Sequence, residues 1–146
     1  MNKQALKAYG QKSLELEVES ASPHKLILLL FDGAIQAIKQ ARFHMEGGNI
    51  PEKGRLISKA IAIVDQGLLA ALDRQAGGEL ADNLATLYIY CCERLFAANL
   101  HNDPAALDEV VRLLGEIKGA WEEIGKPQAG NAAGDSGKSG VNYGAA

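Results

Sequence analysis

The side chains that could do chemistry are three histidines, two adjacent cysteines and two carboxylates set within apolar stretches. His24, His44 and His101 fall near expected helix ends, where a histidine is usually solvated or helps to cap the helix. A di-iron bundle needs inward-facing Glu-x-x-His motifs from two helices, and the sequence contains none. Asp32 and Asp73 come from different segments, and two lone carboxylates do not define acid–base catalysis. We therefore expect no catalytic residue.

The two cysteines, Cys91 and Cys92, do not suggest redox or metal chemistry. Neighbours on a helix point about 100° apart, so a disulfide between them would be strained. No CxxC motif or Cys/His cluster completes a tetrahedral zinc site. The glycine pairs follow no strand, so they do not form a phosphate-binding loop. We expect two small apolar fillers in a reducing compartment, with no metal and no cofactor.

Helix-capping residues divide the chain into four helix-length segments. Ser22 with Pro23 and Asp103 with Pro104 are typical of an N-cap followed by proline in the first turn. The pairs at 47–48 and 77–78 are glycines suited to ending a helix. We expect helices over about 23–45, 50–75, 79–100 and 104–124. Connections this short predict an all-α fold, an antiparallel up-down-up-down four-helix bundle over residues 22–125.

Two segments lie outside the predicted bundle. Residues 1–21 carry a weak amphipathic pattern that indicates an extra helical or extended segment. Gly, Ala and Ser dominate residues 126–146, so we expect a flexible tail that cannot offset the entropy of ordering. Val141 and Tyr143 are its only sizeable apolar groups.

Composition restricts the class of protein further. A chain of 146 residues argues for one domain. A net charge of −3 argues against nucleic-acid binding, and 5% aromatic residues argue against base-stacking platforms. No signal peptide opens the chain, and no apolar run approaches the roughly 20 residues that span a bilayer. We therefore expect a cytoplasmic protein without membrane insertion.

The middle segments carry more apolar residues than one buried helix face needs. In the second segment we assign the core face to Ile57, Ile61, Val64, Leu68 and Leu72, and an adjoining face to Leu56, Ala60, Ile63, Gly67 and Ala70. In the third segment the two faces are Leu80, Leu84, Leu87, Cys91, Leu95 and Ala98, and Ala81, Ala85, Tyr88, Cys92 and Phe96. The surplus either widens the core or forms an exposed groove for a partner helix, and spacing alone favours the core.

Several short motifs, taken in order, resemble the FliS-type flagellin export chaperones. The likeness covers Tyr9 to about Ile124. Each motif alone is weak, but their order and spacing together are specific. They are ASPHKLI (21–27), FDGAI (31–35), KG (53–54), ISKA (57–60), LD (72–73), GGELADNL (77–84), LY (87–88), Tyr90, AN (98–99), Asp103, LL (113–114), Ile117 and AW (120–121).

The resemblance implies a cytoplasmic helical bundle that binds the disordered C-terminal segment of flagellin. Such a chaperone prevents premature polymerisation and delivers its client to the flagellar type III export gate, with no nucleotide or metal. With flagellin as the partner, the adjoining faces that spacing assigns to the second and third segments become the expected groove, at Leu56, Ala60, Ile63, Gly67, Ala70, Ala81, Ala85, Tyr88 and Cys92. The resemblance also implies that the N-terminal segment, through Leu6, Tyr9 and Leu14, is a displaceable cap over the groove.

The bundle architecture leaves two other functions open. A histidine-phosphotransfer bundle would use His44 as phosphoacceptor, although His44 lies close to a glycine stop instead of mid-helix. A helical adaptor would share only the architecture. Because exposed grooves can self-associate, we also expect a homodimer when no client is bound.

Overall fold

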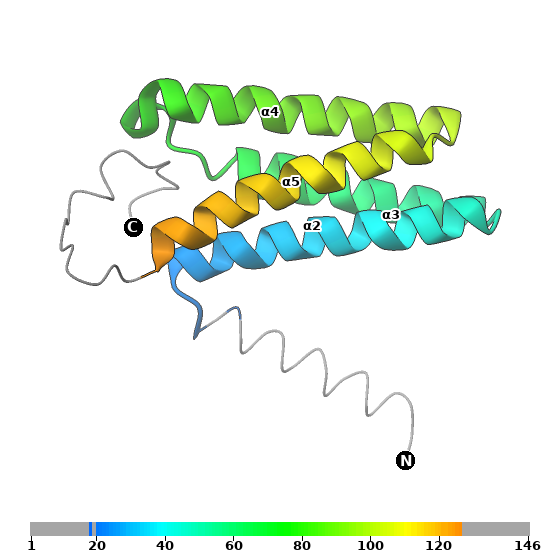
Figure 1. The fold of residues 1–146 in the computed structure, drawn as a ribbon, viewed down its shortest axis with the longest axis horizontal. Helices are drawn as coiled ribbons and strands as arrows, with labels where there is room; N and C mark the ends of the chain where they lie inside the picture. Colours follow the sequence, from blue (N-terminus) through cyan, green and yellow to red (C-terminus); the bar gives the residue numbers. More distant parts are fainter. Residues whose placement is uncertain (1–17, 19, 127–146) are drawn as a thin grey trace, which may run out of the picture.

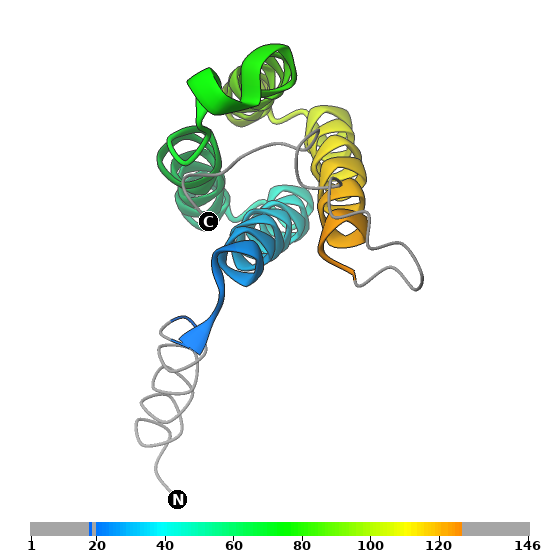
Figure 2. The same ribbon diagram turned by 90° about the vertical axis from the view of Figure 1, so that its left-hand side faces the viewer.

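The computed structural model describes residues 18 and 20–126, and they form four antiparallel helical rods (Figure 1). The elements are α2 (Pro23–Glu46), α3 (Ile50–Ala62), the π-helix η1 (Ile63–Leu69) that continues α3, α4 (Arg74–His101) and α5 (Pro104–Gly125). Seen along the bundle, α2 and α4 occupy opposite corners, with α3 and α5 between them (Figure 2). The predicted all-α four-helix fold is confirmed. None of the described helices is long and apolar enough to span a bilayer.

Side-chain caps begin α2 and α5 where the sequence predicts. The Ser22 hydroxyl accepts a hydrogen bond from the Lys25 backbone N–H at 3.1 Å, and Pro23 opens α2. The Asp103 carboxylate accepts from the Ala105 N–H at 3.0 Å, and Pro104 opens α5. These bonds satisfy N–H groups that have no partner inside the helix. Both predicted proline-supported N-termini are confirmed.

The expected end of the second helix at about Gln75 is wrong. The α-helical part ends at Ala62, and the rod continues as a π-helix only to Leu69. Asp73 then acts as the N-cap of α4, because its carboxylate accepts from the Ala76 N–H at 2.9 Å. The predicted glycine break survives as a kink within α4, where Gly78 has φ 56° and ψ −135°. The cap at Asp73 therefore assigns residues 74–77 to the next rod.

Large apolar side chains from all four rods meet in one core. Phe31, Ile57, Tyr88 and Leu107 are each fully buried, one from each rod. The Phe31 and Tyr88 rings are tilted against each other, with centroids 6.4 Å apart, across the diagonal between α2 and α4. The core therefore fixes the face that each rod turns outward.

Glycines allow α2 and the second rod to approach closely. A Cβ atom added at Gly67 would lie 3.1 Å from Leu30 Cδ2, closer than ordinary van der Waals contact. A Cβ atom at Gly33 would meet Ile63 Cδ1 at 3.5 Å. The small-residue stripe, for which spacing alone favours the core over a partner groove, lies at Ile63 and Gly67 against the chain's own α2.

Candidate partner-binding surface

The structure divides the nine predicted groove residues between interior and surface. Five have buried side chains, namely Leu56, Ala60, Ala81, Ala85 and Tyr88. Ile63, Gly67 and Cys92 are partly buried, and Ala70 is exposed. Leu56, Ala60 and Tyr88 belong to the main core, so their side chains do not line an open groove in this structure. Their contact with flagellin stays a prediction.

The core faces assigned from spacing need correction on α4. Leu80 and Leu87, placed by spacing on the same face as Leu84, are 41% and 37% exposed. Tyr88, placed on the adjoining face, is fully buried. Spacing finds apolar stripes on a helix, but the positions of the neighbouring rods decide which stripe is buried.

One continuous apolar stripe on α4 faces outward. Ile89, Cys92, Phe96 and Leu100 follow one another at intervals of three, four and four residues, so they share one side of the helix. Ile89, Phe96 and Leu100 are 46%, 65% and 66% exposed, and Cys92 is partly buried. We call these four residues the α4 outer stripe. A run of large exposed apolar groups typically marks a binding surface.

The α4 outer stripe lies on the α3 side of α4. The Cys92 thiol is 3.9 Å from the Ile61 carbonyl oxygen, which places this side against the second rod. On the other side of α4, the Tyr90 hydroxyl and the Arg94 guanidinium donate to the Glu109 carboxylate of α5 at 2.6 and 2.7 Å. These two bonds lower the pKa of Glu109 below its usual value, because both favour the charged carboxylate.

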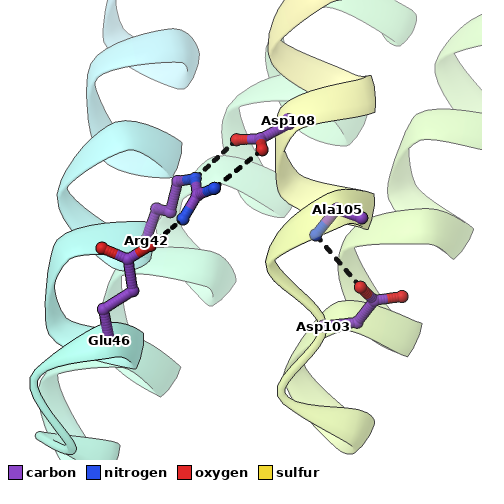
Figure 3. A network of polar contacts seen from close by, with 5 residues as sticks. All are labelled: Arg42, Glu46, Asp103, Ala105 and Asp108. Atoms are coloured by element: carbon purple, nitrogen blue, oxygen red, sulfur yellow. Dashed lines mark hydrogen bonds and ion pairs between the residues drawn. The ribbon is translucent and has the colours of Figure 1, made fainter.

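A second polar network joins α2 to α5. Arg42 donates two hydrogen bonds to the Asp108 carboxylate, at 2.6 and 2.9 Å, and also pairs with Glu46 one turn along α2 (Figure 3). Further along the same helix pair, Lys118 pairs with Asp32 at 2.6 Å. Asp32 lies within an apolar stretch of the sequence, but its side chain is exposed and its partner is this lysine. These ion pairs hold the rods in register and leave the α4 outer stripe uncovered within the described residues.

The cysteines lack the chemistry of a reactive thiol. Burial raises the pKa of Cys91 to about 12 and that of Cys92 to about 11, so both stay protonated at neutral pH. A thiol must be ionised to act as a nucleophile or a metal ligand. Cys91 fills the core as a small apolar group, and Cys92 completes the α4 outer stripe.

The histidines lie near helix ends, as the sequence predicts. His24 stacks on Trp121 with ring centroids 4.7 Å apart, and its carbonyl oxygen accepts from the indole N–H at 3.1 Å. His44 lies in the last turn of α2, partly buried and edge-on to Phe43. A phosphoacceptor histidine needs a mid-helix position open to solvent, which His44 does not have.

Some predicted residues cannot be placed. Leu6, Tyr9 and Leu14 of the predicted cap, and residues 127–146 of the predicted tail, lie outside the described residues. Ile89 and Leu100 are the surface residues that sequence reasoning missed. Their only signal was the three- and four-residue spacing from Cys92 and Phe96, and that spacing does not distinguish a core face from a surface face.

The fold and the surface together define a class, that of small helical bundles that bind a partner through an apolar face. Comparison with known proteins agrees. The family model described as "Flagellar protein FliS" matches residues 5–128. The chain is 52% identical to the flagellar secretion chaperone FliS of Salmonella typhimurium over 119 residues, which cover 82% of this chain and 88% of that protein.

Two further relatives agree with this match. The chain is 52% identical to the flagellar secretion chaperone FliSB of Pseudomonas aeruginosa over 120 residues, 82% of this chain and 94% of the relative. It is 31% identical to FliS of Bacillus subtilis over 116 residues, 80% and 82% of the two chains. The chain belongs to the FliS family of flagellar secretion chaperones, which are not enzymes. This membership decides against the phosphotransfer alternative.

Proposed function

We propose that this protein binds the C-terminal segment of flagellin in the cytoplasm and keeps it from polymerising before export. It then delivers flagellin to the flagellar type III export gate. The observation that carries the proposal is the α4 outer stripe, a line of large apolar side chains on the surface of a chain that belongs to a family of secretion chaperones. An amphipathic client segment can lay its apolar face along such a stripe.

The stripe suits a client that must later be released. A disordered segment that folds on binding spends part of its contact energy on becoming ordered. Full burial of a phenylalanine side chain stabilises a complex by about 1.5–3 kcal/mol. Phe96 is 65% exposed and therefore has most of this surface left to bury. A few such contacts hold the client without making its release at the gate too slow.

Replacing an exposed phenylalanine with serine on either of two rods tests the proposal. Phe96→Ser removes the largest side chain of the α4 outer stripe, and we expect it to weaken binding of a flagellin C-terminal peptide about tenfold or more, measured by calorimetry. The matched control is Phe43→Ser, which removes a similarly exposed ring from α2, the helix at the opposite corner of the bundle (Figure 2). Equal affinities of the two variants would refute a client site on the stripe. Lack of binding by the unaltered protein to any flagellin would refute the function itself.

We also propose that the N-terminal segment, through Leu6, Tyr9 and Leu14, caps the client site until flagellin displaces it. The resemblance to the FliS family and the apolar side of this segment support the cap. Tyr9→Ala should leave helicity unchanged and alter the affinity for flagellin. An unaltered affinity, with normal helicity by circular dichroism, would contradict the cap.

Without a client, we propose that two copies associate through the exposed stripe. Leu100 is 66% exposed at one end of it, and apolar surface of this kind is costly to leave in water. The mass measured by light scattering should rise towards that of a dimer with concentration, and Leu100→Ser should reduce the rise. A monomer at every concentration would contradict self-association.

A further inference from the structure

A second apolar feature lies on the α5 side of α4, away from the α4 outer stripe. It is a cleft of about 280 Å³ between α2, α4 and α5, walled chiefly by Phe31, Leu84, Trp121 and Ile124. Of its lining residues only Glu116 carries a charge. Ligand pockets for whole small molecules usually enclose about 300–1,000 Å³, so a cleft of this size suits one or two side chains.

The C-terminal tail leaves the bundle at the wall of this cleft. Ile124 lines the cleft, and Lys126 is the last described residue. Gly125 fits closely beside His24, since an added Cβ atom would lie 2.1 Å from His24 Nε2. Gly125 at the end of α5 therefore lies against the first turn of α2. The family model ends at residue 128, so nearly all of the tail lies outside the matched region.

The tail carries a short apolar motif at a distance from which it can return to the cleft. Its only sizeable apolar groups, Val141 and Tyr143, are separated from the bundle by about 15 residues rich in glycine, alanine and serine. A chain of that composition has a root-mean-square span of roughly 20 Å. Trp121 lies only about 5 Å along α5 from Ile124. The effective concentration of the motif at the cleft is therefore on the order of millimolar.

We propose that Val141 and Tyr143 of the chain's own tail dock in this cleft. The Tyr143 ring packs beside Trp121, and its hydroxyl donates to the Glu116 carboxylate. Tyrosine suits the site because it combines a large apolar ring with one polar group, as the cleft combines apolar walls with one carboxylate. A motif held at millimolar effective concentration occupies the cleft even when its affinity is too weak for association between separate molecules at micromolar concentration.

The N-terminal segment is the competing occupant. It joins the bundle at Ser22, two residues before His24, which stacks on Trp121 of the cleft wall. The tail begins shortly after Ile124, which is itself part of the cleft wall, and the variants below distinguish the two segments.

The only tryptophan of the chain, Trp121, lines the cleft and reports on docking. The test compares the emission maximum and acrylamide quenching of the full chain with those of the double variant Val141→Ser/Tyr143→Ser, excited where tryptophan alone absorbs. We expect the double variant to be red-shifted and its quenching constant to rise about twofold, because about half of the molecules or more hold the motif in the cleft. Asn142→Ser, which changes the polar residue between the two, is the matched control and should behave as the unaltered chain.

Three outcomes would overturn the proposal. The first is an emission spectrum and a quenching constant that do not differ between the double variant and the control. The second is a shift produced by Leu14→Ser and not by the double variant, which would assign the cleft to the N-terminal segment. The third is a difference that grows with protein concentration, which would assign it to a second copy. Equal far-ultraviolet circular dichroism of all variants shows that the bundle itself is unchanged.

Discussion

Replacing Lys53 with methionine should destabilise the bundle by about 2–3 kcal/mol, although the two side chains are similar in length and apolar area. Lys53 is only 3% exposed, and it is the buried charged side chain of the described residues. Its ammonium group donates to the Asn99 carbonyl oxygen at 2.9 Å and to Asn102 Oδ1 at 2.7 Å. Asn102 is the left-handed C-cap of α4, with φ 49° and ψ 53°. Lys53 therefore places a positive charge at the C-terminus of α4, where carbonyl groups lack helical partners.

The magnitude follows from three opposing effects. A hydrogen bond from a charged donor contributes about 1.5–3 kcal/mol, and Lys53 makes two such bonds. The charge at a partly buried helix C-terminus adds up to about 2 kcal/mol. Removing the buried ammonium also relieves a desolvation cost of several kcal/mol, which offsets much of the loss. The net loss of about 2–3 kcal/mol corresponds to a Tm lower by about 7–13 °C for a domain of this size.

Urea unfolding followed by circular dichroism and Trp121 fluorescence measures this effect. The midpoint for Lys53→Met should fall by about 1–2 M while the slope m stays the same. Lys59→Met, the same exchange at an exposed position of the same helix, is the control and should change the free energy of unfolding by less than about 0.5 kcal/mol. If both variants unfold at the midpoint of the unaltered chain, the argument that a buried charge caps α4 is wrong.

Three further predictions concern packing, pH and thiol reactivity. Gly67→Val should cost about 1–3 kcal/mol in urea unfolding, because its Cβ atom would lie 3.1 Å from Leu30 Cδ2, whereas Gly115→Val, which meets nothing within 4 Å, should not destabilise. Because the folded-state pKa of Glu109 is lowered, its stabilisation is present above the ordinary value of 4.5 and is lost as the pH falls through the folded-state pKa. Glu109→Gln should therefore lower the urea midpoint at pH 7, with a difference that shrinks below pH 4.5; a constant difference would contradict this. Since burial raises the pKa of Cys92 to about 11, a thiol reagent at pH 8 should react far more slowly with the native chain than with the unfolded one, and equal rates would refute the assignment.

The parts of the fold that sequence predicts correctly depend on interactions between near neighbours. At Ser22 and Asp103 the capping bond spans three and two residues, so the residue types alone specify it. The end of the second rod is different. Asp73 is also a local cap, but it lacks the following proline that marks Ser22 and Asp103, and the glycine pair at 77–78 predicts the boundary instead. The glycine pair predicts the end of a helix, whereas Gly78 forms a kink inside one.

For the candidate site, too, the sequence shows some features and leaves others to the tertiary structure. The family motifs and the surplus of apolar residues on the middle helices were legible in the sequence, and they led to the correct family. Spacing could not show which of these apolar residues are exposed. Leu56 and Ile57, for example, are adjacent and both buried. A periodic pattern assigns such neighbours to different faces, while a rod in contact with both α2 and α4 buries more than one face.

The sequence by itself determined four helices, their antiparallel order, the absence of catalytic motifs and the family. Capping, periodicity and motif order are properties of short segments, and short segments retain them in any packing. Only the tertiary structure decided that the Leu30 side chain packs against Gly67 and that Lys53 is buried at the end of α4. It also decided that Ile89, Phe96 and Leu100 remain exposed. Burial depends on which rods lie next to each other, and that arrangement follows from contacts between residues far apart in the chain.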